Sequence, residues 1–231
     1  MNMDKFSFYK EHPKSCDPKD FWGQVKRTVN GKPVSKEQID MIVEAAAAGL
    51  LLDSEDVLLD ICCGNGALTN LFFERCRGGL GVDFSEYLIS IANQNFAKET
   101  ISEYLLEDVV EFCLAPKSAA NFTKALCYGS FSYLEHAQAK KMLKALYDNF
   151  PHLKRVFIGN LPDRKLIKLF YGDTPVEPQL ANDPGSAIGI WRTKEQFVEM
   201  VGSDRWKVEF RRMPENYYAA HYRYDAVLIR L

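Results

Sequence analysis

Residues 56–69, DVLLDICCGNGALT, decide the fold of this chain. An apolar run at 57–61 predicts a buried strand, and the chain then turns at Gly64, Asn65 and Gly66. Glycine lets the backbone turn tightly and come close to another group, although it costs conformational entropy. The stretch therefore predicts a central strand that ends in a binding turn.

Downstream of this turn, short apolar segments alternate with segments of helical pattern. The patterns predict strands at 57–61, 80–84, 101–108, 124–129 and 155–160, and helices at 67–76, 85–96, 109–114 and 137–150. Such alternation is typical of βαβ units, in which helices cover both faces of a parallel sheet. Two further strands, at 206–213 and 217–231, flank a short PEN turn and must be antiparallel. We therefore predict an α/β fold with a doubly wound, mostly parallel, seven-stranded sheet and a C-terminal antiparallel hairpin.

One domain with an N-terminal cap is predicted. Residues 1–34 mix charged, proline and aromatic side chains, which indicates a helical cap without a core of its own. The domain proper is expected over 35–231 and begins with a helix that Ser35 caps, with Gln38 three residues later. The proline- and glycine-rich stretch at about 162–192 is predicted to be an irregular insertion, which is typical of functional loops.

Composition limits the classes of partner. The chain has 29 basic and 31 acidic side chains, so its net charge of −2 gives no overall field that favours nucleic acid or an anionic membrane. No run of 18 apolar residues and no signal-peptide pattern is present. The six cysteines show no CxxC spacing, which indicates free thiols in a reducing compartment and no metal site. We expect a cytoplasmic protein with a small-molecule partner, and a homodimer stays open.

Acidic residues stand near the ends of the next two strands. Asp83 lies about twenty residues after the glycine turn, where a ribose binds in nucleotide sites. Asp108 ends the following strand, where its carboxylate could accept a hydrogen bond from an adenine amine. Alternatively, Asp108 caps the next helix and Glu107 is the partner of adenine. Because ligands of open α/β sheets bind at the carboxyl ends of strands, these groups are predicted to share one site. Thr69 stands where a dinucleotide fingerprint requires a third glycine or alanine, so the sequence gives less support to a pyrophosphate-binding site.

The motifs DICCGNG, GVDFS and LLEDV, in this order and spacing, resemble those of the class I S-adenosylmethionine-dependent methyltransferases of small-molecule type. The resemblance covers roughly residue 35 to the C-terminus. It implies a Rossmann-like fold, with S-adenosylmethionine as cofactor. The methionine portion of the cofactor would meet the glycine turn, and its ribose would bind Asp83. Its adenine would contact Asp108 and Phe84, and its carboxylate would bind Arg27 of the cap. The implied cofactor-binding set is Asp60, Cys62, Gly64, Asn65, Gly66, Asp83, Phe84, Glu107, Asp108, Val109 and Arg27.

The segments after the fourth and fifth strands would then surround the methyl group. Tyr128, Tyr133 and His136 are our catalytic candidates there; His136 can take a proton near neutral pH, although an exposed place at a helix start suits it equally. The NPPY-type tetrad of methyltransferases that act on amino groups of nucleic acids and proteins is absent, and CYGS stands in its place. We therefore expect methyl transfer to an oxygen or nitrogen of a small polar metabolite or sugar-linked acceptor, with the insertion as its lid.

Other functions stay open at this point. An NAD-dependent oxidoreductase on a related fold would need a catalytic pair such as YxxxK, which the sequence lacks. A non-catalytic, S-adenosylmethionine-binding partner subunit would bind the cofactor without turnover. An RNA methyltransferase would need a basic surface or an RNA-binding module, and the sequence indicates neither.

Overall fold

Helices and strands alternate along the chain, as the sequence predicts. The structure is a computed structural model that describes residues 7–174, 176–177 and 179–231. The strands are β1 (Thr28–Val29), β2 (Lys32–Pro33), β3 (Leu58–Ile61), β4 (Gly79–Asp83), β5 (Ser102–Leu106), β6 (Lys124–Tyr128), β7 (Arg155–Pro162), β8 (Trp206–Arg211) and β9 (Arg223–Arg230). The α-helices are α1 (Ser7–Glu11), α2 (Phe21–Gln24), α3 (Lys36–Leu50), α4 (Ala67–Phe73), α5 (Glu86–Asn95), α6 (Val109–Leu114), α7 (His136–Asp148), α8 (Ile167–Tyr171) and α9 (Lys194–Val201). The 3-10 turns are η1 (His12–Ser15), η2 (Ala119–Asn121), η3 (Phe131–Tyr133), η4 (Arg164–Leu166) and η5 (Leu180–Asn182).

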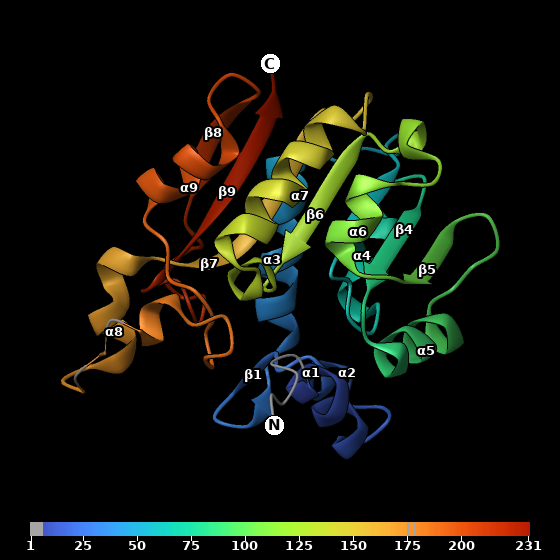
Figure 1. The fold of residues 1–231 in the computed structure, drawn as a ribbon. Coiled ribbons are helices and arrows are strands. Elements are labelled where there is room, and N and C mark those ends of the chain that lie inside the picture. The colour runs from blue at the N-terminus through green and yellow to red at the C-terminus, as the bar shows by residue number, and fades with distance from the viewer. Residues whose placement is uncertain (1–6, 175, 178) are drawn as a thin grey trace.

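A seven-stranded sheet forms the middle layer of the molecule (Figure 1). Its strands lie in the order β5-β4-β3-β6-β7-β9-β8. The neighbours from β5 to β7 pair in parallel, whereas β9 pairs antiparallel with both β7 and β8. The predicted mostly parallel sheet with a C-terminal antiparallel hairpin is therefore confirmed. The strand order reverses between β3 and β6, and such a switch point is where open α/β sheets bind ligands.

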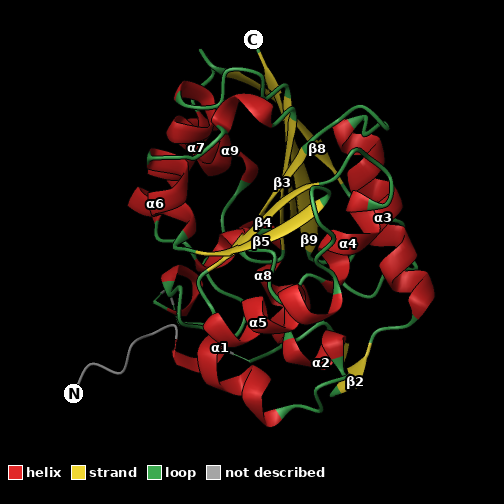
Figure 2. Cartoon of the chain, turned by 90° about the vertical axis from the view of Figure 1, so that its right-hand side faces the viewer, coloured by secondary structure: helices red, strands yellow, loops and turns green. Residues whose placement is uncertain are grey.

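Helices cover both faces of the sheet (Figure 2). Alternate side chains of the central strands point to opposite sides, as strand geometry requires. Leu59 of β3 and Cys127 of β6 pack with α6, α7 and α9, whereas Leu58 and Leu126 pack with α3, α4 and α5. Burial on both faces explains why these strands are continuous apolar runs in the sequence.

The helix starts differ in part from the predicted caps. Thr193 caps α9, because its Oγ1 accepts from Gln196 N at 3.2 Å. Ser35 stands at the N-cap position of α3 but makes no side-chain capping bond. Gln38 does not reach back to Ser35; its side chain instead bonds Asn216 O and the amide N of residue 218. The predicted capping box is therefore wrong, and Gln38 fixes α3 to the segment before β9.

The C-terminal hairpin has a longer connection than predicted. β9 begins at Arg223, so residues 217–222 belong to the connection and not to a strand. Tyr217 and Tyr222 of this connection are buried in the core beside α3. Their apolar character resembles that of a strand in sequence, although their burial comes from packing across the connection.

The N-terminal segment lies beyond the carboxyl ends of the parallel strands (Figure 1). It contains the short helices α1 and α2 and the two-stranded β1–β2 ribbon. Residues 1–6 of the predicted cap lie outside the described residues. The stretch predicted as an insertion contains η4, α8 and η5. The domain boundaries at 34/35 and at about 162–192 stay predictions.

Within the described part of the chain, no helix is both long and apolar enough to cross a lipid bilayer.

A buried ion pair fixes the amino ends of β3 and β6. Lys124 Nζ lies 3.3 Å from Asp56 Oδ2, and both side chains are 8% exposed. Lys124 Nζ also donates to Leu50 O at 2.9 Å, and Thr123 Oγ1 donates to Asp56 Oδ1 at 2.7 Å. The pair therefore joins the end of α3 to two central strands.

We expect Lys124→Met to lower the free energy of unfolding by about 3–5 kcal/mol, because it leaves the Asp56 charge buried without its cation. Urea unfolding of the variant measures this loss. Lys36→Met is the matched control: its pair with Asp40 is exposed, with side chains 82% and 50% accessible, and we expect a change below about 1 kcal/mol. Equal losses in the two variants would contradict this account.

Candidate functional site

Left-handed backbone conformations shape the turn after β3. Cys62, Gly64 and Gly66 have φ angles of 65°, 59° and 77°. The amide of Cys62 donates to Val82 O at 2.9 Å, which fixes the turn to β4. A Cβ on Gly66 would lie 2.8 Å from Tyr104 Cε1, closer than side chains tolerate. Glycine at this position therefore allows the turn to close against β5.

Asp83, at the end of β4, holds the glycine turn from the side. Its carboxylate is buried, and its Oδ2 accepts from Gly64 N while its Oδ1 accepts from Ser85 N, each at 2.9 Å. Burial raises the pKa of Asp83, and the backbone amides around it oppose that rise. Because each carboxylate oxygen has more than one acceptor site, Asp83 can still accept hydrogen bonds from a ligand.

Asp60 is a second buried acid, on the neighbouring strand β3. Its Oδ2 accepts from Thr69 Oγ1 at 2.5 Å, and its exposure is 3%. Burial raises the pKa of Asp60 to about 7; the Thr69 hydrogen bond and the Arg27 charge lower it, and the Asp83 charge raises it. Two buried carboxyl groups thus share this edge of the sheet with the Arg27 guanidinium. Such a site favours a ligand that brings positive charge.

The N-terminal cap closes over the turn through Asn65. Its Nδ2 donates to Phe21 O at 2.7 Å and to Gln24 Oε1 at 2.8 Å. A Cβ on Gly64 would lie 3.0 Å from Val25 Cγ1, so the Val25 side chain of the cap lies against the turn. Residues 21–25 therefore form a roof over the binding turn.

Aromatic contacts extend this roof along the same edge. Phe21 of the cap packs on Phe96, just after α5, with ring centroids 5.1 Å apart. Phe84 follows Asp83, and Lys10 Nζ of α1 lies 5.6 Å from the centre of its ring. The cap therefore spans the carboxyl ends from β3 to β4.

We expect Asn65→Ala to loosen the cap, since it removes two hydrogen bonds worth on the order of 1 kcal/mol each. Hydrogen exchange should then be about tenfold or more faster in residues 21–27, with β6 unchanged. Asn70→Ala, on the helix α4 that follows the turn, is the control because the Asn70 side chain bonds Glu74 at the end of that helix and not the cap. Unchanged protection of residues 21–27 would show that Asn65 does not hold the cap.

The end of β5 contributes Asp108 and Glu107. Asp108 Oδ1 accepts from Val110 N at 2.9 Å and from Glu111 N at 3.1 Å, so it caps α6. Both of these bonds use Oδ1. The amide of Glu107 donates to Asp83 O at 3.0 Å, which brings the ends of β4 and β5 together. Val109, the first residue of α6, is buried beside them. Contacts of these residues to adenine stay a prediction.

Tyr128 ends β6 on the other side of the switch point. It is buried, its Oη lies 2.9 Å from Tyr217 Oη, and Arg27 Cζ lies 5.5 Å from its ring centre. Arg27 also lies over the Trp22 ring, at 5.6 Å. Burial raises the pKa of Tyr128 well above its usual value, so the phenol stays protonated and is suited to hydrogen bonding rather than to proton removal. Tyr128 and Arg27 thus lie at one edge of the sheet.

Tyr133 and His136 lie further from the turn. Tyr133 Oη donates to Ala187 O at 3.0 Å, and its ring is 4.9 Å from that of Tyr9, so it connects the cap with the insertion. His136 begins α7, is exposed and lines a cavity of about 350 Å³ together with Arg164 and Arg192. None of the predicted cofactor residues lines that cavity. The catalytic roles of Tyr133 and His136 stay predictions.

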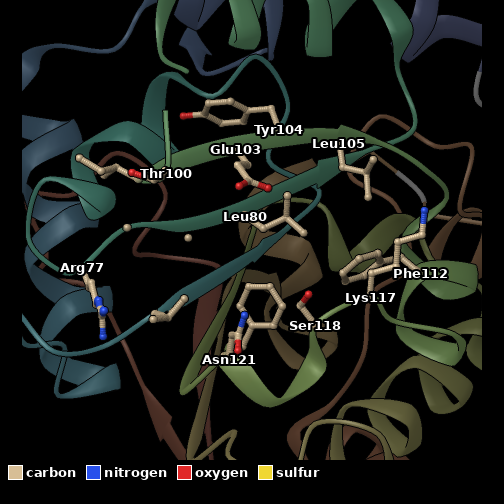
Figure 3. A pocket seen from close by; sticks show the side chains of 15 residues that line it. Arg77, Leu80, Thr100, Glu103, Tyr104, Leu105, Phe112, Lys117, Ser118 and Asn121 are labelled. Atoms are coloured by element: carbon tan, nitrogen blue, oxygen red, sulfur yellow. The ribbon is translucent and has the colours of Figure 1, made fainter. Parts of the chain in front are cut away.

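Another cavity, of about 610 Å³, lies at the opposite end of the sheet (Figure 3). Its walls come from the amino-terminal parts of β4 and β5 and from the segment before β6. Figure 3 shows Arg77, Thr100, Glu103, Lys117 and Asn121 around it. It contains none of the predicted site residues, and it lies away from the switch point.

Sequence reasoning missed Thr69 and Tyr217. Thr69 lies in the first turn of α4, nine residues after Asp60, and a hydroxyl there is a local signal that could have been used. Tyr217 lies 89 residues from Tyr128, and no pattern in the sequence pairs them.

Comparisons with known proteins agree with this geometry. Residues 58–150 match the family model described as a methyltransferase domain. The probable cobalt-precorrin-6B C(15)-methyltransferase (decarboxylating) of Methanocaldococcus jannaschii is 35% identical over 72 residues, which are 31% of this chain and 37% of that protein. An uncharacterised methyltransferase of Schizosaccharomyces pombe is 34% identical over 77 residues, 33% of this chain and 28% of that protein. The chain thus aligns with well under half the length of these relatives.

Solved structures share the whole fold. The N-methyltransferase NodS of Bradyrhizobium japonicum, solved with S-adenosylhomocysteine, superposes with a TM-score of 0.64 at 12% identity, over 99% of both chains. The magnesium protoporphyrin IX methyltransferase of Synechocystis, solved with S-adenosylmethionine, gives 0.62 at 15% identity over 99% of this chain and 98% of that one. Likeness at these identities shows the fold, and the family match places the glycine turn and both buried acids within the methyltransferase domain. Residues 58–150 therefore match a methyltransferase domain, and the chain has the class I methyltransferase fold.

Proposed function

We propose that this protein binds S-adenosylmethionine at the carboxyl ends of β3, β4 and β5 and transfers its methyl group to an oxygen or nitrogen of a small polar or sugar-linked acceptor. The observation that supports this most is the pair of buried acids, Asp60 and Asp83, beside the glycine turn. A buried carboxylate is costly without a cation or hydrogen-bond donors. S-adenosylmethionine supplies cationic groups, its ammonium and sulfonium, and hydrogen-bond donors, its ribose hydroxyls.

Each part of the cofactor has a complementary group among the described residues. Asp83 would accept from the two ribose hydroxyls, and Asp60 would face the ammonium group of the amino-acid portion. Arg27, which lies over Tyr128, would bind the cofactor carboxylate. Adenine would lie against Phe84 and the start of α6, next to Val109.

The protein's own contribution to the reaction is binding and alignment. When bound, S-adenosylmethionine supplies a methyl group that its sulfonium already activates. Asp60, Asp83 and Asn65 hold the turn and the cap in place, and the roof over residues 62–66 excludes water. Tyr128 presents a neutral hydroxyl at the end of β6 to orient the acceptor. A proton acceptor is required only for a protonated amine or a hydroxyl, and His136 is the candidate for it.

An NAD-dependent oxidoreductase fits this site less well. A pyrophosphate would bring two negative charges to a turn that already lies between Asp60 and Asp83. Methyl transfer to RNA is also less favoured, because the net charge of −2 gives no basic surface. A non-catalytic subunit that binds the cofactor would have the same site. Only a demonstration of catalytic turnover excludes this alternative.

Two measurements test the proposal. Calorimetric titrations with S-adenosylhomocysteine and with NAD should show binding of the first and none of the second. Incubation with S-adenosylmethionine carrying a labelled methyl group and fractionated polar metabolites should then label a small molecule. Binding of NAD in preference would support the oxidoreductase, and cofactor binding without label in any fraction would support the non-catalytic subunit.

A further inference from the structure

Arg192 is a buried guanidinium without a carboxylate partner. Its exposure is 4%, and its Nη2 donates to Leu134 O at 2.6 Å. Its Nη1 is buried and has no hydrogen-bond partner, and the ion pairs among the residues that the structure describes include none with Arg192. Its Cζ lies 5.4 Å from the centre of the Phe131 ring. Burial lowers the pKa of Arg192 to about 10. An uncompensated buried cation is costly, so the site as described lacks an anion.

Asp163, which neighbours Arg192 through the backbone, is already paired. Asp163 forms a backbone bridge with Arg192, but its Oδ2 accepts from Arg212 Nη2 at 2.7 Å and its Oδ1 accepts from Lys165 N at 3.0 Å. Glu135 and Glu199 line the cavity that Arg192 borders, and neither lies within ion-pair distance of it. The described residues therefore do not supply the counter-charge.

Arg192 lines the cavity of about 350 Å³, and other positive groups surround the same space. Arg164 lies on it, and its Nη1 donates to Asn182 Oδ1 at 2.8 Å. The starts of α7 and α9 also border it, but both are already capped, α7 by the Glu135 side chain and α9 by that of Thr193. The positive charge of the cavity therefore comes from its two guanidinium groups, which share the wall with Glu135 and Glu199.

The cavity lies at the edge of the sheet where an acceptor would bind. His136 follows the end of β6, and Arg164 and Arg192 lie at the end of β7, on the β6–β7 side of the switch point. The insertion contributes Arg164 and Asn182 to its wall. We propose that this cavity binds an anionic group of the methyl acceptor, a carboxylate or a phosphate, through Arg192 and Arg164. That the anion belongs to the acceptor rests on the proposed methyl transfer, whereas the anion site itself does not.

Thermal unfolding in the presence of inorganic phosphate tests the site, with sodium chloride at equal ionic strength as the blank. Phosphate should raise the unfolding temperature of the wild-type protein, and a parallel series with acetate shows whether a carboxylate is also bound. In Arg192→Met the affinity for phosphate should fall about tenfold or more, because charge-assisted hydrogen bonds are lost. Arg192→Lys keeps the charge and should retain part of the protection.

Arg75→Met is the matched control, because Arg75 is paired with Glu44 at 2.6 Å on the other face of the sheet. It should keep the full effect of phosphate. If Arg192→Met does not fold, Arg164→Met takes its place with the same expected loss. Equal protection by phosphate in wild type and variant, or no protection of either, would overturn the proposal.

Binding of S-adenosylhomocysteine to the same variants separates this proposal from the proposed function. We expect Arg192→Met to bind it as the wild type does, since Arg192 lies outside the cofactor set. If phosphate raises the unfolding temperature but the cofactor does not bind, the methyl-transfer proposal is contradicted and the anion site stands. If the cofactor binds but phosphate does not raise the unfolding temperature, only the anion site is contradicted.

Discussion

The Asp83→Ala protein should bind S-adenosylhomocysteine at least about a hundredfold more weakly than the wild-type protein. The reason is that Asp83 would accept from both ribose hydroxyls, and hydrogen bonds to a charged group contribute about 1.5–3 kcal/mol each. Isothermal calorimetry at pH 8 measures the loss directly. The effect is large because Asp83 is buried, so that water cannot replace its oxygens.

Asp83 also holds the turn through Gly64 N and Ser85 N, so the variant needs controls. Asp83→Asn keeps the shape and one acceptor oxygen, and we expect an intermediate loss of about tenfold. Asp40→Ala removes an exposed acid from α3 and should leave the affinity unchanged. Thermal unfolding shows whether each protein is folded. Wild-type affinity in a folded Asp83→Ala protein would mean that the ribose lies elsewhere.

A second large effect is expected from pH, through Asp60. Because the pKa of Asp60 is raised to about 7, its carboxyl group is neutral at pH 6 and charged at pH 8. The charged form attracts the ammonium group of the ligand's amino-acid portion, which S-adenosylmethionine and S-adenosylhomocysteine share. Affinity for S-adenosylhomocysteine should therefore fall as pH falls through 7, by up to about tenfold per pH unit.

Asp60→Asn should bind weakly at both pH values and lose most of this dependence. Calorimetry on wild type and variant across pH 6–8 makes the comparison, and the variant corrects for ionisation of the ligand itself. In the ligand-free protein, the free energy of unfolding depends on pH with the opposite sign. A carboxyl group whose pKa is raised on folding stabilises the protein at low pH, and this contribution of Asp60 is lost as pH rises through about 7. A wild-type affinity that does not change with pH would show that Asp60 does not face the ligand.

The parts of the fold that could be predicted are those with a local pattern. The glycine turn, the buried strand β3 and Asp83 follow from apolar runs and their spacing along the chain. The capping of α9 by Thr193 follows from adjacent residues in the same way. β9 shows the limit: residues 217–222 resemble a strand in sequence, yet they form a connection in which Tyr217, Ala219 and Tyr222 are buried.

Contacts between distant segments could not be predicted from one sequence. Tyr128 meets Tyr217 across 89 residues, and Asn65 meets Gln24 across 41. The cavity of Arg192 joins α7, η4 and the start of α9, which are far apart in the chain. In sequence Arg192 is an ordinary arginine before a helix, and only its burial without a carboxylate shows that it differs.

A crystal structure of the protein with S-adenosylhomocysteine tests the central claim most directly. The account predicts the ligand at the carboxyl ends of β3, β4 and β5, with its ribose oxygens within about 3.2 Å of the Asp83 carboxylate and its amino-acid portion at the turn of residues 62–66. Density for the ligand in the cavity of Figure 3, or a ribose away from Asp83, would contradict it.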